Sequence, residues 1–173
     1  LQIPTLVEEK TYDVIIEVDG EDEDGDNHEM VWELTLEVKK DKHDLIIDRA
    51  ELSPQTIKCD RNPSLDTRIV NIGREDEDDV SIEIKNSELG LNVREDDIEI
   101  DEGDNEDAVF GKSYNLRIDD KVKAGTYPIN VKVYYDSKST DEERVDLIVQ
   151  SCVEAVTSVE AKEPVEVITT PPV

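Results

Sequence analysis

The residues best suited to chemistry in this chain are the carboxylates of one acidic loop. Asp22, Asp24 and Asp26 stand at alternate positions in it, and Glu33 follows eleven residues after Asp22. Hard oxygen ligands at this spacing resemble the loop of an EF-hand, which binds calcium. Asn27 occupies the position where that loop requires glycine, and strands are expected on both sides instead of helices. The spacing therefore predicts either a Ca²⁺ site at the three aspartates or a solvated acidic tip, and the tip is the simpler interpretation.

No group of residues has the pattern of a catalytic site. The sequence lacks a nucleophile elbow, a P-loop, a dinucleotide-binding glycine motif and zinc-ligand spacing. His28 lies in the acidic loop and His43 in a charged connection, and neither has a nucleophile at a suggestive spacing. We therefore expect that the protein is not an enzyme.

Two cysteines, Cys59 and Cys152, are the only other residues with distinctive chemistry. Each lies beside a predicted strand, Cys152 just after the last one. We predict one disulfide between them, which implies an oxidising, extracellular setting. The alternative is two free thiols.

The chain is strongly acidic, with 46 Asp and Glu against 19 Lys and Arg and a formal net charge of −27. Such a field repels nucleic-acid phosphates and anionic lipid surfaces, and it attracts cations. No apolar run approaches the roughly 18 residues that a membrane-spanning helix needs. We therefore expect cations as partners, and neither nucleic acid nor a direct membrane span.

The elements that position these residues are strands, of which residues 127–135 are the clearest. Apolar residues alternate there, which is the period of a strand with one buried face. Tyr127, at its start, can anchor the preceding turn through a hydroxyl hydrogen bond. Turn residues separate similar short segments between residues 44 and 152. We predict an all-β protein with an immunoglobulin-like β-sandwich, whose strands are 45–51, 56–59, 65–72, 80–85, 91–94 with 98–100, 112–118, 127–135 and 144–150.

A further alternating pattern lies near the N-terminus. Residues 11–18 and 30–38 each place apolar side chains on one face, and the acidic loop joins them, so a hairpin with a long tip is predicted. Trp32 and Leu34 lie on its apolar face. Because an isolated two-stranded hairpin is marginal in water, another element must cover that face. A neighbouring subunit is favoured, and the 44–152 domain and the C-terminal tail are the alternatives.

This hairpin repeats the C-terminal part of the chain without gaps at an offset of 115 residues. The identities pair Leu1, Ile3, Val7, Thr11, Tyr12 and Val18 with Leu116, Ile118, Val122, Thr126, Tyr127 and Val133. The same offset aligns Met30, Trp32 and Leu34 with Val145, Leu147 and Val149. We therefore interpret residues 1–43 as the C-terminal part of a preceding sandwich repeat and residues 44–152 as the complete copy, in a tandem array. The alternative is that any two amphipathic hairpins look alike.

The composition changes after Cys152. Residues 153–173 contain no glycine and no aromatic residue and end in Pro-Pro-Val, which is typical of an extended tail or linker. Val165 and Val167 alternate within it, so this part is suited to adding a strand to an open sheet edge. We assign these valines, with Trp32 and Leu34, to assembly between subunits.

Several segments together resemble archaeal S-layer proteins, and more broadly the CARDB-like immunoglobulin-type adhesion modules of prokaryotic surfaces. They are Leu45-Ile46-Ile47, Leu52-Ser53-Pro54, Cys59, Val70-Asn71-Ile72-Gly73, Val80, Ala124-Gly125-Thr126-Tyr127, residues 131–136 and Cys152. The resemblance covers residues 44–152 and, more weakly, 1–43. It implies extracellular, tandem domains that form or decorate the cell envelope.

The function expected from these observations is structural. A tandem β-sandwich unit would build an extracellular lattice (an S-layer), a sheath or a filament, as a homo-oligomer or self-assembling polymer. The alternative is an adhesin-like or carbohydrate-binding module on a surface stalk, which needs an exposed aromatic platform; aromatic residues make up only 4 % of the chain. A third interpretation is that the acidity reflects a high-salt habitat.

Overall fold

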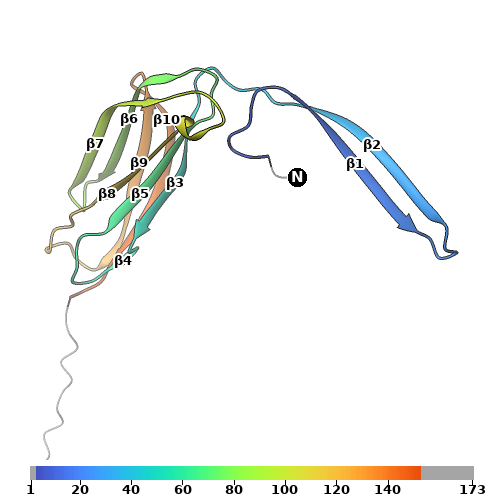
Figure 1. Ribbon diagram of the computed structural model, residues 1–173. Coiled ribbons are helices and arrows are strands. Elements are labelled where there is room, and N and C mark those ends of the chain that lie inside the picture. The colour runs from blue at the N-terminus through green and yellow to red at the C-terminus, as the bar shows by residue number, and fades with distance from the viewer. Residues whose placement is uncertain (1–2, 153–173) are drawn as a thin grey trace, which may run out of the picture.

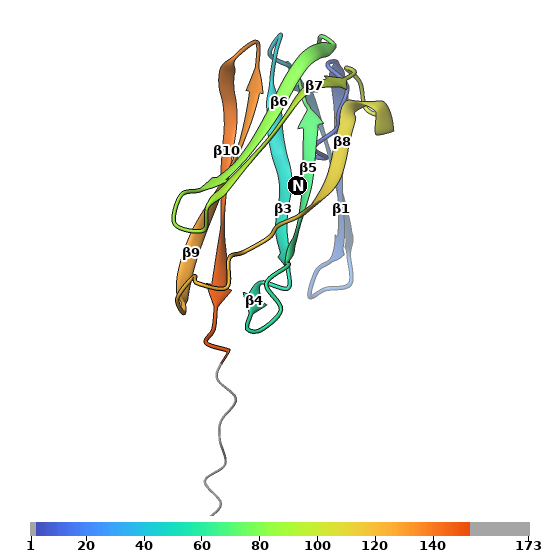
Figure 2. The same ribbon diagram turned by 90° about the vertical axis from the view of Figure 1, so that its left-hand side faces the viewer.

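Two sheets pack face to face between residues 45 and 149 and enclose an aliphatic core (Figure 1, Figure 2). Their strands pair antiparallel, except for one short parallel pair between residues 56–57 and 148–149. The structure is a computed structural model, and residues 3–152 are described. The smaller sheet has the order β3-β5-β8, with β3 at Leu45–Ser53, β5 at Ser64–Asn71 and β8 at Val109–Asn115. No helix within these residues is long and apolar enough to cross a membrane.

The larger sheet has five strands in the order β4-β10-β9-β6-β7. They are β4 (Thr56–Ile57), β6 (Glu77–Asn86), β7 (Leu91–Ile100), β9 (Gly125–Tyr135) and β10 (Lys138–Val149). A single 3₁₀ turn, η1 (Glu106–Ala108), precedes β8 within the described residues. This arrangement is an immunoglobulin-like β-sandwich, as predicted, in which β9 and β10 form the last hairpin.

The core follows from the alternation in each strand. Ile129, Val131 and Val133 of β9 are each 0 % exposed, and Leu65 and Ile69 of β5 belong to the same buried cluster from the opposite sheet. Aliphatic side chains dominate this cluster, which explains how a chain with few aromatic residues still has a closed interior.

Several strand boundaries differ from the prediction by a few residues, and the differences at β10 and β8 change how the chain is described. β10 begins at Lys138, six residues before the predicted start, because Asp136 and Ser137 form a tight turn with φ of 44° and 63°. β8 ends at Asn115, and the chain then continues without a ladder: the amides of Leu116 and Ile118 donate to the carbonyls of Pro63 and Arg61 at 2.9 Å. The buried positions are unchanged, since both residues are 2 % exposed.

The remaining two strands form a separate hairpin that extends away from the sandwich (Figure 1). β1 (Thr11–Glu21) and β2 (Asn27–Glu37) pair along their whole length. Within residues 3–152 they form a two-stranded sheet of their own. The predicted hairpin is therefore present, and its environment decides what it can do.

Candidate functional site

The hairpin has one apolar face. Successive cross-strand pairs place Ile16 opposite Trp32 and Val14 opposite Leu34, and Tyr12–Leu36 and Val18–Met30 continue the same face at either end. Trp32 is 55 % exposed and Leu34 54 % exposed, as are other large side chains of this face: Met30 (52 %), Val18 (52 %) and Ile16 (37 %). Within the described residues, the predicted apolar face therefore exists and is uncovered.

The other face of the hairpin is mostly polar. Asp13 pairs with Thr35 and Asp19 with Glu29, as expected for a solvated surface. Ile15 and Val31 are the exceptions, and they are 59 % and 49 % exposed. The apolar face of the hairpin is therefore the one suited to packing against another element, because alternation of this kind determines which side of a strand is buried.

A matching hydrogen bond begins both hairpins. The Tyr127 hydroxyl donates to the carbonyl of Lys123 at 2.9 Å, and the Tyr12 hydroxyl donates to the carbonyl of Glu8 at 3.2 Å. Both bonds reach four residues back from equivalent tyrosines. Such a bond holds the turn that leads into a strand, so the predicted anchor at Tyr127 is present, and the repeat extends from sequence to side-chain geometry.

The second strands of the two hairpins do not align as the sequence comparison predicted. Tyr12 lies opposite Leu36, 24 positions on, whereas Tyr127 lies opposite Leu147, 20 positions on. The gapless alignment of Trp32 with Leu147 is therefore wrong. The cause is the longer tip between β1 and β2. The two registers differ by an even number of residues, so apolar side chains still lie on the same face of the second strand. The structural counterparts of Leu34, Leu36 and Val38 are Val145, Leu147 and Val149.

A small apolar cavity at the base of the hairpin shows the same correspondence. It has a volume of about 240 Å³, and its lining includes Ile3, Val14, Leu36 and Val38. Their counterparts in the sandwich are all buried core residues: Ile118, Ile129, Leu147 and Val149, with exposures of 2, 0, 0 and 2 %. The cavity at the base of the hairpin is therefore lined by the counterparts of residues that are buried in the sandwich.

The acidic tip is organised around the side chain of Asp22. Its Oδ1 accepts hydrogen bonds from the amides of Asp24 and Asp26, both at 3.0 Å, and its Oδ2 lies 2.9 Å from His28 Nε2. The His28 contact, followed by these amides, lowers the pKa of Asp22. Glu33 lies opposite Ile15, well along β2. Within residues 3–152, no three His, Cys, Asp or Glu side chains converge as a metal-binding group.

The disulfide between Cys59 and Cys152 closes the end of the sandwich at which β10 finishes. Its Cα atoms are 4.9 Å apart and the bridge spans 93 residues. The two cysteines meet because β4 pairs with the end of β10, and the Gln150 amide continues the contact by donating to the Ile57 carbonyl at 2.8 Å. The predicted disulfide is present.

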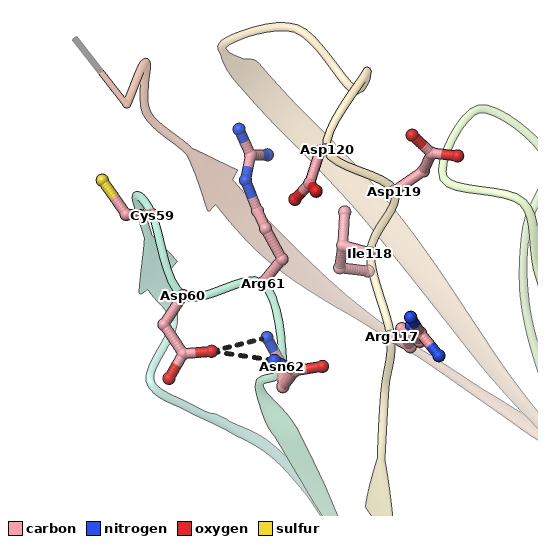
Figure 3. A pocket seen from close by; sticks show the side chains of 8 residues that line it. All are labelled: Cys59, Asp60, Arg61, Asn62, Arg117, Ile118, Asp119 and Asp120. Carbon is pink, nitrogen blue, oxygen red and sulfur yellow. Dashed lines mark hydrogen bonds between the residues drawn. The ribbon is translucent and has the colours of Figure 1, made fainter.

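A polar cavity of about 430 Å³ lies beside this bridge (Figure 3). Arg61, 8 % exposed, lines it and donates to the carbonyl of Val122 at 3.5 Å. Asp60 Oδ1 accepts from the amide and side chain of Asn62, as the dashed lines in Figure 3 show. The other lining residues are Cys59, Arg117, Ile118, Asp119 and Asp120. Apart from Cys59 and Ile118, the lining side chains are therefore polar or charged.

A buried carboxylate ties the connection after β2 to the sandwich. Glu77 is 0 % exposed, its Oε1 lies 3.0 Å from His43 Nδ1, and its Oε2 has no partner. The His43 ring also stacks on Tyr135, with centroids 4.6 Å apart. Burial raises the pKa of Glu77, and the His43 contact opposes this shift. No sequence pattern links the two residues of this pair, since they are 34 positions apart.

Two of the four predicted assembly residues lie in the part of the chain that the structure describes. Trp32 and Leu34 lie on the open face of the hairpin, whereas Val165 and Val167 lie outside the described residues. Their suggested pairing remains a prediction.

Comparison with known proteins returns likenesses of fold only. No protein-family model and no curated protein matches the chain. Among solved structures, the chain is similar to the CARDB domain of a Pyrococcus furiosus protein, a crystal structure described as a complex with di-metal ions. The identity is 11 % and the TM-score 0.46, over 66 % of this chain and 93 % of that one. A solution structure of the same domain gives 11 % identity and a TM-score of 0.44, over 62 % of this chain and 94 % of that one.

Proposed function

We propose that this chain is part of a structural protein of the cell surface, in which tandem immunoglobulin-like units build an extracellular lattice (an S-layer), a sheath or a filament. The observation that carries the proposal is the repeat: one chain contains a complete sandwich and a second copy of its last hairpin, with the same tyrosine anchor. Arrays of such units are elongated, because each unit contacts only its neighbours along the chain.

The disulfide supports an extracellular location. Bridges of this kind persist where the environment is oxidising and are rare in the cytosol. Cys59–Cys152 closes the end of the sandwich from which the chain continues toward residue 173. A covalent bridge at that end resists the opening of the sandwich by tension along an array.

The acidic surface gives the proposed assembly a dependence on cations. At a net charge of −27, neighbouring units repel one another, and salt screens this repulsion over about 8 Å at physiological ionic strength. A specific Ca²⁺ site at Asp22, Asp24 and Asp26 would be one source of this cation dependence. It is tested by titrating the protein with CaCl₂ and with MgCl₂ while the backbone amide NMR signals of residues 22–28 are followed; a specific site gives saturable shifts with calcium that Asp22→Asn abolishes.

The second candidate function is a surface module that binds carbohydrate, and one observation favours it. Trp32 is a 55 % exposed aromatic ring on the open face of the hairpin, and exposed aromatic rings can stack on sugar faces. Its neighbours across the strand and along it are aliphatic, which suits protein contact better. Specific binding to a glycan array, lost in Trp32→Ala, would favour this candidate over the lattice.

The decisive experiment is electron microscopy of the native cell envelope, with the protein located by antibody. A regular array or filament containing the protein is expected. Recovery of the native protein as a soluble intracellular monomer with free thiols would contradict the proposal.

A further inference from the structure

We propose that β1 and β2 are the last hairpin of a second immunoglobulin-like sandwich and that their apolar face is the docking surface for the other strands of that sandwich. The occupant is a set of strands equivalent to β3, β5, β6 and β8, with an aliphatic inner face. The inference rests on the tandem array proposed above and names the partner of its open hairpin.

The first argument is what surrounds the equivalent hairpin. The inner face of β9 and β10 is covered by the β3-β5-β8 sheet, and Ile129, Val131 and Val133 are completely buried there. The counterparts of these three residues in β1 are Val14, Ile16 and Val18. A face that carries the same residue pattern needs the same kind of cover, and the described strands of the smaller sheet already cover β9 and β10.

The second argument is the free edge of β1. β9 pairs with β10 along one edge and with β6 along the other, where Ile82 lies opposite Val133 and Ile84 opposite Val131. β1 pairs with β2 alone among the described residues. Its other edge therefore presents unpaired amides and carbonyls, which accept an added strand. A strand equivalent to β6 satisfies this edge and extends the apolar face.

The third argument concerns the apolar residues that line the cavity at the base of the hairpin. Four residues that line the cavity there, Ile3, Val14, Leu36 and Val38, match four buried core positions of the sandwich. The correspondence includes the segment before the strand, because the Tyr12 hydroxyl holds Glu8 as Tyr127 holds Lys123. Any amphipathic hairpin would show alternating apolar residues, but it would not share the tyrosine hydrogen bond and the apolar residues that precede the first strand.

One difference defines the occupant more closely. By strand register, Trp32 and Met30 stand where β10 has Glu143 and Asp141. The apolar face of the hairpin therefore reaches nearer to its tip than the face of β9 and β10 does. The occupant needs apolar side chains further along its strands at that end.

A fusion protein tests the proposal with the full chain intact. A copy of residues 44–115, with its Cys59 changed to serine, is placed directly before Leu1. Asn115 then runs into Leu1 as it runs into Leu116 in the chain, and the repeat is continuous. We expect Trp32 emission to move to shorter wavelength and amide exchange in β1 to slow by about tenfold or more.

Two neighbouring isoleucines on opposite faces supply the matched control. Ile16→Asp in the fusion protein should abolish both effects, because it places a charge on the docking face. Ile15→Asp should leave them unchanged, because that side chain lies on the polar face.

The reciprocal chimera keeps the proposal testable if the added strands fail to fold. Residues 9–38 replace residues 124–149 of the full chain, which aligns Tyr12 with Tyr127 and Val38 with Val149. The chimera should unfold cooperatively and form the disulfide. The proposal is overturned if β1 exchange and Trp32 emission are unchanged in the fusion protein and the chimera also lacks cooperative unfolding.

Evidence for either of two other occupants of the apolar face would also overturn the proposal. If deletion of residues 153–173 from the original chain shifts Trp32 emission to longer wavelength, the tail covers the face. If dilution of the original chain does so, a second copy covers it. Failure of the fusion protein and the chimera leaves the lattice proposal standing, because that proposal is tested on the native envelope.

Discussion

The hairpins β1-β2 and β9-β10 have similar sequences and opposite environments. Val133 is 0 % exposed in one, and its identical counterpart Val18 is 52 % exposed in the other. Both hairpins have the same tyrosine anchor and apolar alternation, and both pair antiparallel, although their registers differ. The comparison teaches that local pattern decides strand, face and turn, whereas the free energy of burial, about 25 cal/mol per Å² of apolar surface, comes only with a covering sheet.

The largest expected difference between the hairpins comes from a charge on the inner face. Leu147→Asp should destabilise the sandwich by at least about 5 kcal/mol, because it removes a buried side chain and buries an unpaired carboxylate. Leu36→Asp, its counterpart, should change the free energy of unfolding of the sandwich by less than about 0.5 kcal/mol. Urea unfolding followed by circular dichroism measures both. A large effect of Leu36→Asp would mean that the hairpin packs on its own chain.

Loss of the disulfide should affect the sandwich next most strongly. A bridge across 93 residues stabilises by roughly 4 to 5 kcal/mol in the chain-entropy model. The double variant Cys59→Ser with Cys152→Ser should lower the free energy of unfolding of the sandwich by about this amount and leave exchange in β1 unchanged. A loss below about 1 kcal/mol would contradict a stabilising role, and two free thiols by mass spectrometry would refute the bridge.

Removing the two tyrosine hydroxyls should change the stability of the sandwich by different, smaller amounts. Tyr127→Phe removes the hydrogen bond to Lys123 and should cost the sandwich about 1 kcal/mol. Tyr12→Phe should not change sandwich stability, although it removes the equivalent bond to Glu8. Chemical denaturation of the two variants side by side distinguishes them. Equal losses would show that the hairpin and the sandwich unfold as one unit.

The smallest expected change in the free energy of unfolding comes from the Glu77–His43 contact, and it depends most on pH. The pKa of Glu77 is raised above its ordinary value of 4.5, so the folded state binds its proton more tightly than the unfolded state does. The contribution of Glu77 to stability is therefore present below pH 4.5 and is lost as the pH rises through the raised pKa.

Glu77→Gln tests this sign. The variant should gain stability relative to the native protein as the pH rises from about 4.5 to 7, whereas the exposed neighbour variant Glu75→Gln should show no such trend. Thermal melts across this range measure the difference. A relative loss of stability with rising pH in Glu77→Gln would show that the ionised carboxylate is stabilised by His43.

Alternation and turn residues were sufficient to predict the sandwich, the hairpin, the disulfide and the apolar face. The register of β2 was predicted incorrectly, because a gapless alignment cannot detect a longer tip when the shift preserves the apolar phase. The Glu77–His43 contact could not be predicted, since it depends on how the connection after β2 meets the start of β6. The role of Asp22 was also unexpected: acidic spacing suggests a cation, but the side chain first satisfies the amides of its own turn.

Amide hydrogen exchange of the full chain at high dilution tests the central claim most directly, because it compares both hairpins in one molecule. The amides that β9 contributes to its ladders should exchange only through global unfolding, and those of β1 should exchange with opening free energies near zero. That result would identify β1-β2 as a hairpin without its sandwich. Protection of β1 equal to that of β9 in the monomer would contradict the account.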